Sequence, residues 1–547
     1  MGYLNIIEPQ HTGLVPGTVL LDDEAETQRD FTSALKHVPG KHGNIILSPQ
    51  PDDDPNNPLN FSQRKKLLIM AVICFGVCIH GCTVSPLLNA GLVEIADELD
   101  TSVALVVQSS GYQLLVVALM VFFVNSFARK WGKRPTFLLS SLIGIVGSII
   151  GATSQNYGNL LTARIIQGFG VSAYEALGLA VVGDLFFVHE RGLYTGILSF
   201  VLGGVSNFSS VVCGPVTIQL GWKWLFYLLI IFETVHLVLQ FLFVPETQHR
   251  RATPILPPIA PSPKESCVSI EDVEDIRPIF PPKAPWVHEL RVYNGTYSSE
   301  NFFTLLCMPI LACLNLSVLW SVIVSGYFLS IYVATAYLLS PVFTAAPYFL
   351  TASGVGYLSL APFLGGGVAF VVASLTGDMI VRKCSQNNKG YFEPEYRLLL
   401  GAGGILAVPG FVGFGYAAQT GQSYYLTAFL HGLGLCGIMF VLISAANYSL
   451  DAFRPMRTEI FLCSMSCKNL FIFIYSYFIN DWAVRAGTFQ VMWALCAVSV
   501  GVLSTYPLVF LFGKKYRSHW AQSQVAMKVA DLTFDEGDVR EARISRE

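Results

Sequence analysis

The sequence predicts an all-α membrane protein in which twelve transmembrane helices form two pseudo-symmetric bundles of six. Its composition is the first reason, because 53% of the 547 residues are hydrophobic, 13% are charged and the mean hydropathy is +0.53. A soluble chain could not bury this apolar excess, even with several cores. The other two reasons are the number of long apolar runs and the distribution of basic residues between them.

Long apolar runs recur along the whole chain, and about 20 such residues suffice to cross a bilayer as a helix. The first half holds six mainly apolar runs, at 67–93, 101–128, 135–163, 164–184, 192–222 and 224–244. The second half holds two runs that each suffice for two helices and two runs that suffice for one, at 301–377, 398–450, 460–480 and 486–512. Six spans, a polar linker and six further spans predict a twofold-repeated transporter body.

Polar segments divide the chain into five units. Residues 1–66 and 513–547 form polar tails, and residues 245–300 form a linker rich in proline and charged residues. Such composition is typical of flexible or disordered segments. The six-helix bundles are therefore expected at 67–244 and 301–512.

Basic residues set the orientation, because cytosolic loops carry more lysine and arginine than outer loops. With the N-terminus in the cytosol, every cytosolic loop carries a basic residue, whereas the outer loops carry only Lys223 and Arg485. This alternation holds over all twelve spans. We therefore expect a multi-pass protein of the cell membrane with both tails in the cytosol, and either the plasma membrane or the vacuolar membrane fits.

Several function classes lack support in the sequence. A formal net charge of −3 without an extended basic cluster gives no indication of nucleic-acid binding. The chain contains no HExxH, GxSxG or GxxxxGK motif, so we expect neither an enzyme nor a bound metal ion. A membrane receptor or membrane enzyme is the remote alternative.

The fourth apolar run, RIIQGFGVSAYEALGLAVVGD from Arg164 to Asp184, carries two charges at bilayer depth. On a helix, Arg164, Gly168, Ser172 and Glu175 fall on one face, with the two charges about 16 Å apart along the axis. An ionisable group at this depth costs at least about 2.5 kcal/mol on insertion scales, so it usually faces a protein interior or a watery cavity. We expect this face to line a cavity.

Local motifs resemble a known superfamily. The segment RIIQGFG at Arg164 resembles the span-4 motif RxxQGxG of proton-coupled members of the major facilitator superfamily. The segment RKWGKRP resembles that superfamily's loop between spans 2 and 3, with Asn125 and Arg129 at its usual Gly and Asp positions. Five further segments are similar to the fungal drug:proton antiporter group with twelve spans, including its branch of polyamine and toxin transporters: NPLNFSQRKK, GDLFFVHERG, VPET, YFEPEYRL and CKN.

The resemblance implies a function as well as a fold. Two halves would rock around a central site, and the transport would be proton-coupled, with export of a drug, toxin or secondary metabolite by proton antiport as the first expectation. The alternative is a proton-coupled importer of a nutrient such as a polyamine. The implied partners are a small-molecule substrate and the lipid bilayer, with no cofactor beyond the proton gradient. We expect a monomer.

Proton coupling needs a group that binds and releases a proton within the membrane, and a neighbouring charge whose pairing changes with conformation. Glu175 and Arg164 supply both kinds of group. We expect Glu175 either to take the coupling proton or to bind a cationic substrate, and Arg164 to tune the transition. The alternative is a pair of buried charges that only hold span 4 against its neighbours.

Other intramembrane residues are candidates for the substrate cavity: His80, Tyr112, Gln113, Trp320, Tyr327, Lys468 and Asn469. Lys468 is the strongest, because an unpaired lysine at this depth is costly, and its alternative is a carboxylate partner across the bundle. Tyr332 and Tyr337 add aromatic rings that suit flat or cationic substrates, although most membrane aromatics serve packing. Glu233 and His236 stand one turn apart and can satisfy each other.

A gate is expected at the cytosolic end, formed by the basic loop between spans 2 and 3 together with Asp184. This carboxylate lies about 180° around the helix from Glu175, so it serves another purpose. The basic residues of the loop are Arg129, Lys130, Lys133 and Arg134. The alternative for Asp184 is a solvated carboxylate at the helix end.

Overall fold

The computed structural model describes residues 4, 6–8, 15, 17–20, 37–40, 43–46, 54–249, 284–298, 300–453 and 456–523. Most of the tail at 1–66, the linker from 250 to 283 and the chain from 524 onward lie outside these residues. The disorder expected for those segments therefore stays a prediction.

The described chain contains twelve helices long and apolar enough to cross a membrane. Those of the first half are α1 (Gln63–Gly76) with the π-helical η5 (Val77–Thr83), α3 (Val103–Trp131), α4 (Lys133–Ala152), α5 (Tyr157–Leu185), α6 (Val188–Phe200) with η7 (Val201–Val205) and α7 (Ser206–Leu220), and α8 (Lys223–Phe243). Those of the second half are α11 (Leu316–Thr344), α12 (Ala352–Leu358) with α13 (Leu360–Asn387), η9 (Pro394–Leu406) with α14 (Ala407–Gln419), α15 (Tyr424–Ala452), α16 (Arg457–Ala486), and α17 (Thr488–Leu503) with α18 (Tyr506–Ala521). The predicted all-α fold with twelve spans is confirmed.

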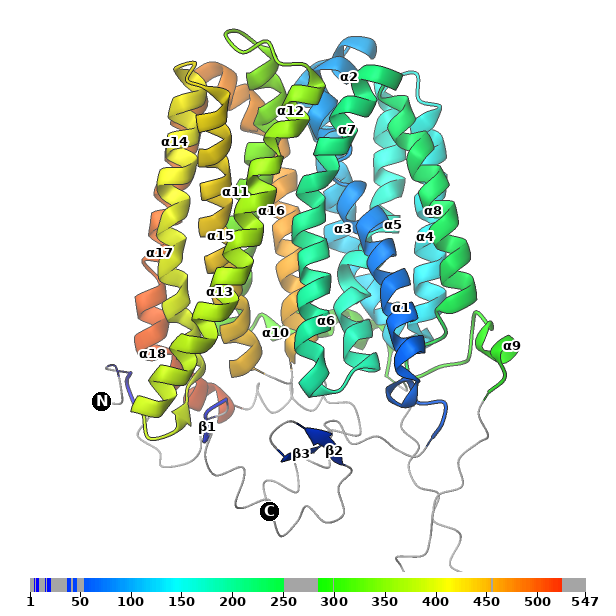
Figure 1. The fold of residues 1–547 in the computed structure, drawn as a ribbon, viewed down its shortest axis with the longest axis vertical. Coiled ribbons are helices and arrows are strands. Elements are labelled where there is room, and N and C mark those ends of the chain that lie inside the picture. The colour runs from blue at the N-terminus through cyan, green and yellow to red at the C-terminus, as the bar shows by residue number, and fades with distance from the viewer. Residues whose placement is uncertain are drawn as a thin grey trace, which may run out of the picture.

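Shorter elements connect or flank these helices. They are η4 (Pro58–Asn60), η6 (Asn89–Gly91), α2 (Leu92–Glu98), α9 (Trp286–Glu289), α10 (Phe302–Ala312), and the strands β1 (Val19–Leu20), β2 (His37–Gly40), β3 (Gly43–Ile46) and β4 (Tyr391–Phe392). The strands form two small antiparallel pairs, β1 with β4 and β2 with β3. Figure 1 shows these pairs at the lower end of the helices.

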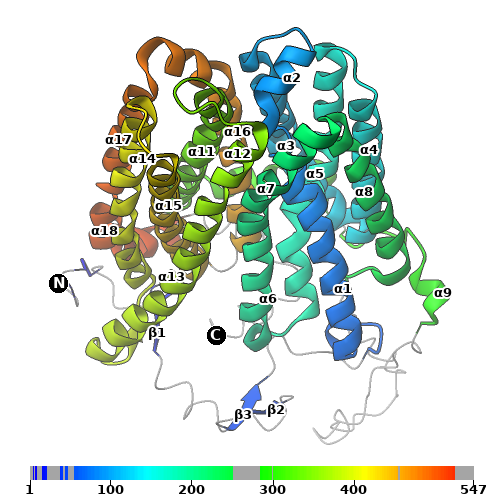
Figure 2. The same ribbon diagram turned by 45° about the horizontal axis from the view of Figure 1, so that its top comes forward.

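The two sets of six helices stand side by side, with α1 to α8 on one side and α11 to α18 on the other (Figure 1). At the upper end, α7 and α12 touch closely: a Cβ at Gly356 would lie 2.5 Å from the Ser210 carbonyl oxygen, and one at Gly214 would lie 2.5 Å from that of Ala352. Toward the lower end, α6 and α13 diverge (Figure 2). The halves are therefore in close backbone contact at the upper end through α7 and α12, and α3 and α16 also join them along their length.

The outer surface of the bundles is apolar where lipid would surround it. On α13, Leu364, Val368, Leu375 and Met379 are all more than half exposed. They follow one another at helical spacing along one side of the helix. A continuous exposed apolar face of this kind suits the hydrocarbon layer of a membrane.

Helices α4 and α5 pack almost backbone to backbone. A Cβ at Gly170 would lie 2.7 Å from the Cα of Gly144, and one at Gly147 would lie 2.8 Å from the backbone nitrogen of Gln167. Small residues at such crossings allow close helix approach within membranes. The contact fixes α5, and with it Arg164 and Glu175, against the rest of the first half.

Part of the tail at 1–66 packs onto the second half. Ile6 is 2% exposed and contacts Cys384 and Tyr396. The backbone nitrogen of Ile7 donates to the Leu511 carbonyl oxygen at 3.1 Å, and β1 pairs with β4. These described pieces of the tail are ordered against the bundle, because apolar side chains anchor them there.

Candidate functional site

A cavity of about 270 Å³ lies between the two halves. Its walls come from η5, η6, α3, α5, α6, η7 and α7 on one side and from α11, α12, α15 and α16 on the other. Most of its surface is apolar, and its polar wall residues include Asn89, Glu175, Asn207, Tyr332, Tyr337, Lys468 and Asn469. Among the described lining residues, Glu175 and Lys468 are the only charged ones, so the cavity carries one charge of each sign.

Glu175 joins the two halves across this cavity. Its Oε1 lies 3.2 Å from Lys468 Nζ, and its Oε2 accepts a 3.0 Å hydrogen bond from Asn469 Nδ2. The side chains of Glu175 and Lys468 are only 7% and 13% exposed. The sequence singled out all three residues, and the carboxylate partner that it left open for Lys468 is Glu175.

Burial of the Glu175–Lys468 ion pair determines how costly it is to separate the two charges. An ion pair removed from water is costly to split, because removal of one partner leaves an uncompensated charge in a medium of low dielectric constant. Protonation of Glu175 would remove the attraction between its carboxylate and the Lys468 ammonium group without breaking any covalent bond. The pair is therefore a buried electrostatic contact between the two halves.

Arg164 lies elsewhere, although it shares a helix face with Glu175. It is fully buried, and it donates to the carbonyl oxygens of Val84 at 2.7 Å and Ser85 at 2.9 Å, as well as to Ser110 and Gln167 at 3.1 Å each. It does not line the cavity. The expected cavity-side stripe thus holds for Glu175, while Arg164 fixes the chain just after η5.

The other cavity candidates of the first half do not reach the cavity. His80 is buried against Tyr174, with ring centroids 4.4 Å apart. Tyr112 makes a hydroxyl–hydroxyl hydrogen bond with Tyr477 of α16, so it links the halves outside the cavity. Gln113 is fully buried, and neither atom of its amide has a partner among the described residues.

The aromatic candidates of α11 divide in two. Trp320 donates from Nε1 to Thr505 Oγ1 at 2.8 Å, and the Tyr327 hydroxyl donates to the Leu495 carbonyl oxygen at 2.8 Å. Both are thus held inside the second half. Tyr332 and Tyr337, further along the helix, line the cavity.

The basic loop at the lower end is held by acidic and carbonyl oxygens. Lys133 forms an ion pair with Asp184, inside the first half. Arg134 donates to the carbonyl oxygens of Phe241 at 2.8 Å and Leu290 at 3.2 Å, and also to that of Val244. Lys130 Nζ donates to the Glu300 carbonyl oxygen at 3.2 Å.

Arg129 makes an ion pair at this end that crosses between the halves. Its Nη1 lies 3.1 Å from Glu459 Oε1 at the start of α16. Sequence reasoning missed Glu459, which stands only two residues after Arg457 at the expected cytosolic end. Pairing a basic loop residue of one half with an acidic helix start of the other would have required knowledge of how the halves dock.

Glu246 holds the turn between α3 and α4. Gly132 occupies this turn with φ of +106°, a conformation that favours glycine. The Glu246 carboxylate accepts from the backbone nitrogens of Lys133 at 2.9 Å, Arg134 at 3.1 Å and Gln248 at 2.9 Å. Burial raises the pKa of this carboxyl, and the backbone donors oppose the rise.

A second contact missed by the sequence lies on the cavity wall. The Tyr332 hydroxyl donates to the Asn207 side-chain oxygen, which joins α11 to α7. The sequence did not identify Asn207 as a site residue, because an isolated asparagine in an apolar run forms no pattern.

Among the described residues, no group of three or more His, Cys, Asp or Glu side chains is arranged to hold a metal ion.

Comparison with known proteins identifies the family. The sequence profile of the Major Facilitator Superfamily matches residues 73–474. The chain belongs to this superfamily. The resemblance predicted from the motifs is confirmed, and the protein is a membrane transporter of the secondary type, not an enzyme.

Relatives and solved structures agree with this membership. An uncharacterized MFS-type transporter of Schizosaccharomyces pombe is 23% identical over 93% of this chain and 94% of its own length. An MFS-type efflux pump of Trichophyton rubrum is 24% identical over 84% of this chain and 74% of its own length. The partially occluded, inward-open xylose transporter XylE of E. coli shares the fold, with a TM-score of 0.56 at 13% identity over 81% of this chain and 97% of that one.

Proposed function

We propose that this major facilitator superfamily member is a proton-coupled exporter of small organic molecules that works by proton antiport, in a cell membrane and with both termini in the cytosol. One observation carries the proposal: a carboxylate of the first half and an ammonium group of the second half meet inside the central cavity. In alternating access, the two halves rock against each other around such a site. A proton that neutralises Glu175 weakens the attraction across the cavity and so favours the rearrangement.

The cavity chemistry supports an organic substrate of modest polarity. Its wall is largely apolar, with the rings of Tyr332 and Tyr337 on one side and amides such as Asn207 on the other. Apolar pockets with a few placed polar groups are typical of small-molecule sites. The T. rubrum efflux pump, at 24% identity, is a relative whose export function fits this chemistry.

The importer of a polyamine is the weaker alternative. A polycation needs an excess of negative charge around it, whereas the described lining pairs its carboxylate with Lys468 and has no net charge. The direction of net transport depends on the order of substrate and proton binding. A neutral or zwitterionic substrate that competes for Glu175 or Lys468 suits proton antiport.

The test uses purified protein in liposomes loaded with a panel of dyes, fungicides and natural products, with an imposed pH gradient. Efflux that follows the gradient in the wild type and loses its pH dependence in Glu175→Gln supports the proposal. Glu98→Gln is the matched control, because Glu98 is half exposed and pairs with Lys223 away from the cavity. Gradient-driven uptake of a polyamine, or pH dependence retained in Glu175→Gln, contradicts the proposal.

A further inference from the structure

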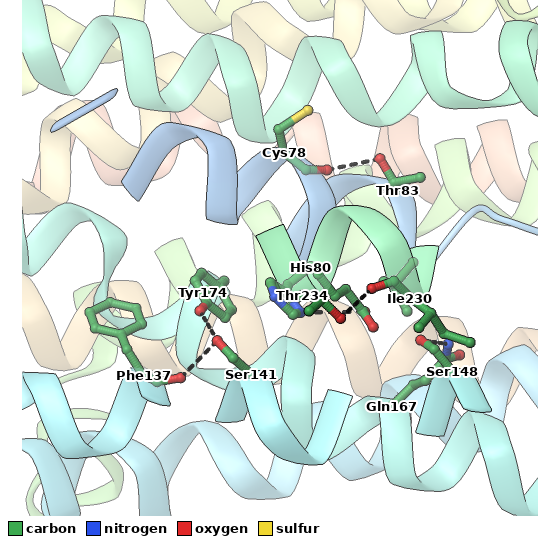
Figure 3. Close-up of polar contacts among 12 residues, drawn as sticks. Cys78, His80, Thr83, Phe137, Ser141, Ser148, Gln167, Tyr174, Ile230 and Thr234 are labelled. Carbon is green, nitrogen blue, oxygen red and sulfur yellow. Dashed lines mark hydrogen bonds and ion pairs between the residues drawn. The ribbon is translucent and has the colours of Figure 1, made fainter. Parts of the chain in front are cut away.

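A second buried carboxylate lies in the core of the first half, away from the central cavity. Glu233 of α8 faces His80 of η5, and its Oε1 lies 3.5 Å from His80 Nδ1. Both side chains are at most 1% exposed, and neither belongs to the cavity wall. Figure 3 shows His80 and Tyr174 in this region, with the Ser141 and Ser148 side chains nearby.

The polar atoms of this core lack the partners that buried groups normally have. By strict hydrogen-bond geometry, neither oxygen of Glu233, nor Nε2 of His80, nor either ring nitrogen of His236 has a partner among the described residues. The Ser148 hydroxyl lies beside the Glu233 carboxylate, and the Val72 carbonyl oxygen lies beside the His236 ring. The expectation that Glu233 and His236 satisfy each other is therefore not met, and Glu233 approaches His80 instead. Buried polar groups without partners are rare and call for a reason.

The surrounding residues are shaped to hold these rings. The His80 ring stacks on Tyr174, with planes 8° apart, and the His236 ring meets His80 edge-on at 5.3 Å between centroids. A Cβ at Gly76 would lie 2.4 Å from His236 Nε2, and one at Gly144 would lie 3.2 Å from His80 Nδ1. Larger residues at these two glycines would displace the rings.

The charges around Glu233 come from few groups. Helix α5 contributes the Tyr174 hydroxyl, which is bonded to Ser141 at 2.5 Å and to Gln240 at 3.0 Å. Helix α4 contributes serine hydroxyls, with Ser148 beside the carboxylate. Helix α8 itself adds His236. Among the described residues, no lysine, arginine or aspartate is paired with Glu233.

A bare carboxylate in such surroundings is costly, because insertion scales give at least about 2.5 kcal/mol for a charge at bilayer depth. One proton removes the cost when Glu233 carries it, because the protonated carboxyl is neutral and lies beside the neutral His80 ring. We propose that Glu233 and His80 form a proton-binding site in the core of the first half, separate from the central cavity. They share one proton, and its release to water leaves Glu233 ionised and His80 neutral.

Proton release from this site requires movement of the helix that carries His80. The π-helical η5 separates the site from the cavity, because Gly81, the residue that follows His80 in η5, belongs to the cavity wall. π-Helical turns are frequent at functional sites. When η5 shifts during the exchange between the two access states, water from the cavity can reach His80, so proton occupancy depends on conformation.

A chain of polar contacts connects the site to the cavity edge. The Ser148 hydroxyl beside Glu233 accepts from Gln167 Nε2 at 3.1 Å, and Gln167 Oε1 accepts from Arg164 Nη1 at 3.1 Å. Arg164 holds the carbonyl oxygen of Ser85, a cavity-wall residue. Arg164 is thus a positioning residue that links the protonation of Glu233 to the chain after η5.

The test needs no substrate, so its failure is distinguishable from failure of the proposed export function. Purified full-length protein in lipid nanodiscs is titrated with acid and base, and infrared difference spectra record the carbonyl band of protonated carboxyl groups. We expect a buried protonated carboxyl at neutral pH that Glu233→Gln removes and Glu175→Gln retains. His80→Gln should keep the band but move the pH midpoint of its titration.

Three results would overturn the proposal. They are a wild-type spectrum without a buried protonated carboxyl, a band that survives in Glu233→Gln, and a titration midpoint that is the same in His80→Gln and the wild type. If Glu233→Gln does not elute as a folded species, His80→Gln and His236→Gln decide the question through the midpoint. The site itself does not depend on the cargo, and only its use in coupling rests on the proposed proton antiport.

Discussion

Two buried carboxylates of this transporter differ in how they are satisfied. Glu175 has an ammonium group and an amide within 3.2 Å, both supplied by the opposite half. Glu233 has His80 at 3.5 Å and the Ser148 hydroxyl beside it, both from its own half, and no lysine or arginine partner among the described residues. The first is an ion pair across a moving interface, whereas the second is a group that needs a proton to stay buried. Glu175 thus serves as a charged contact between the halves, whereas Glu233 serves as a proton-binding group within one half.

Lys468→Met tests the cavity pair and should have the largest effect. It leaves Glu175 as a buried carboxylate whose one remaining partner among the described residues is Asn469. The loss of one partner from a buried pair typically costs about 3–5 kcal/mol. We expect lower thermal stability in nanodiscs and a loss of pH-dependent transport. Calorimetry should show that the double variant Glu175→Gln with Lys468→Met recovers most of the stability. A double variant no more stable than Lys468→Met would argue against direct coupling of the two charges.

Gly76→Val tests the core cluster while leaving the cavity pair in place. The new side chain would overlap His236 and Tyr174, and overpacking of this kind typically costs about 1–3 kcal/mol. We expect a lower unfolding temperature and a shifted titration of the buried carboxyl, with dye binding to the cavity unchanged. Gly501→Val is the control, because a Cβ there meets no atom within 4 Å. Equal effects of the two substitutions would show that the cluster is not tightly packed.

Glu459→Gln tests the link between the halves at the lower end and should have the smallest effect. The Arg129 side chain is 22% exposed, so the ion pair contributes at most about 1 kcal/mol. Hydrogen–deuterium exchange at the start of α16 should become up to about fivefold faster. The same peptide in Glu98→Gln should be unaffected. Unchanged exchange in Glu459→Gln would show that Arg129 does not restrain the second half.

The fold could be predicted from the sequence because hydropathy and loop charge are local properties. Twelve apolar helices follow from composition along the chain, without knowledge of contacts. The face of Glu175 also followed from helical periodicity. Its partner did not, because Lys468 lies 293 residues away and reaches Glu175 only when the halves dock.

Helical periodicity also has limits that Arg164 and Glu233 illustrate. Arg164 shares a face with Glu175, but at another depth, and there it meets the carbonyl oxygens after η5 instead of the cavity. Glu233 stands one turn from His236, yet His80 of another helix lies closer to its carboxylate. Face and spacing determine which residues can meet, whereas the neighbouring helices determine which of them do.

The start of the chain is structurally part of the opposite bundle. Ile6 is buried against Tyr396, Glu8 forms an ion pair with Lys514 at 2.9 Å, and Thr18 donates to Glu393 at 2.7 Å. Residues that precede the first bundle in the sequence therefore pack against the second bundle. For protein engineering, a bulky group fused close to Ile6 would compete with this contact.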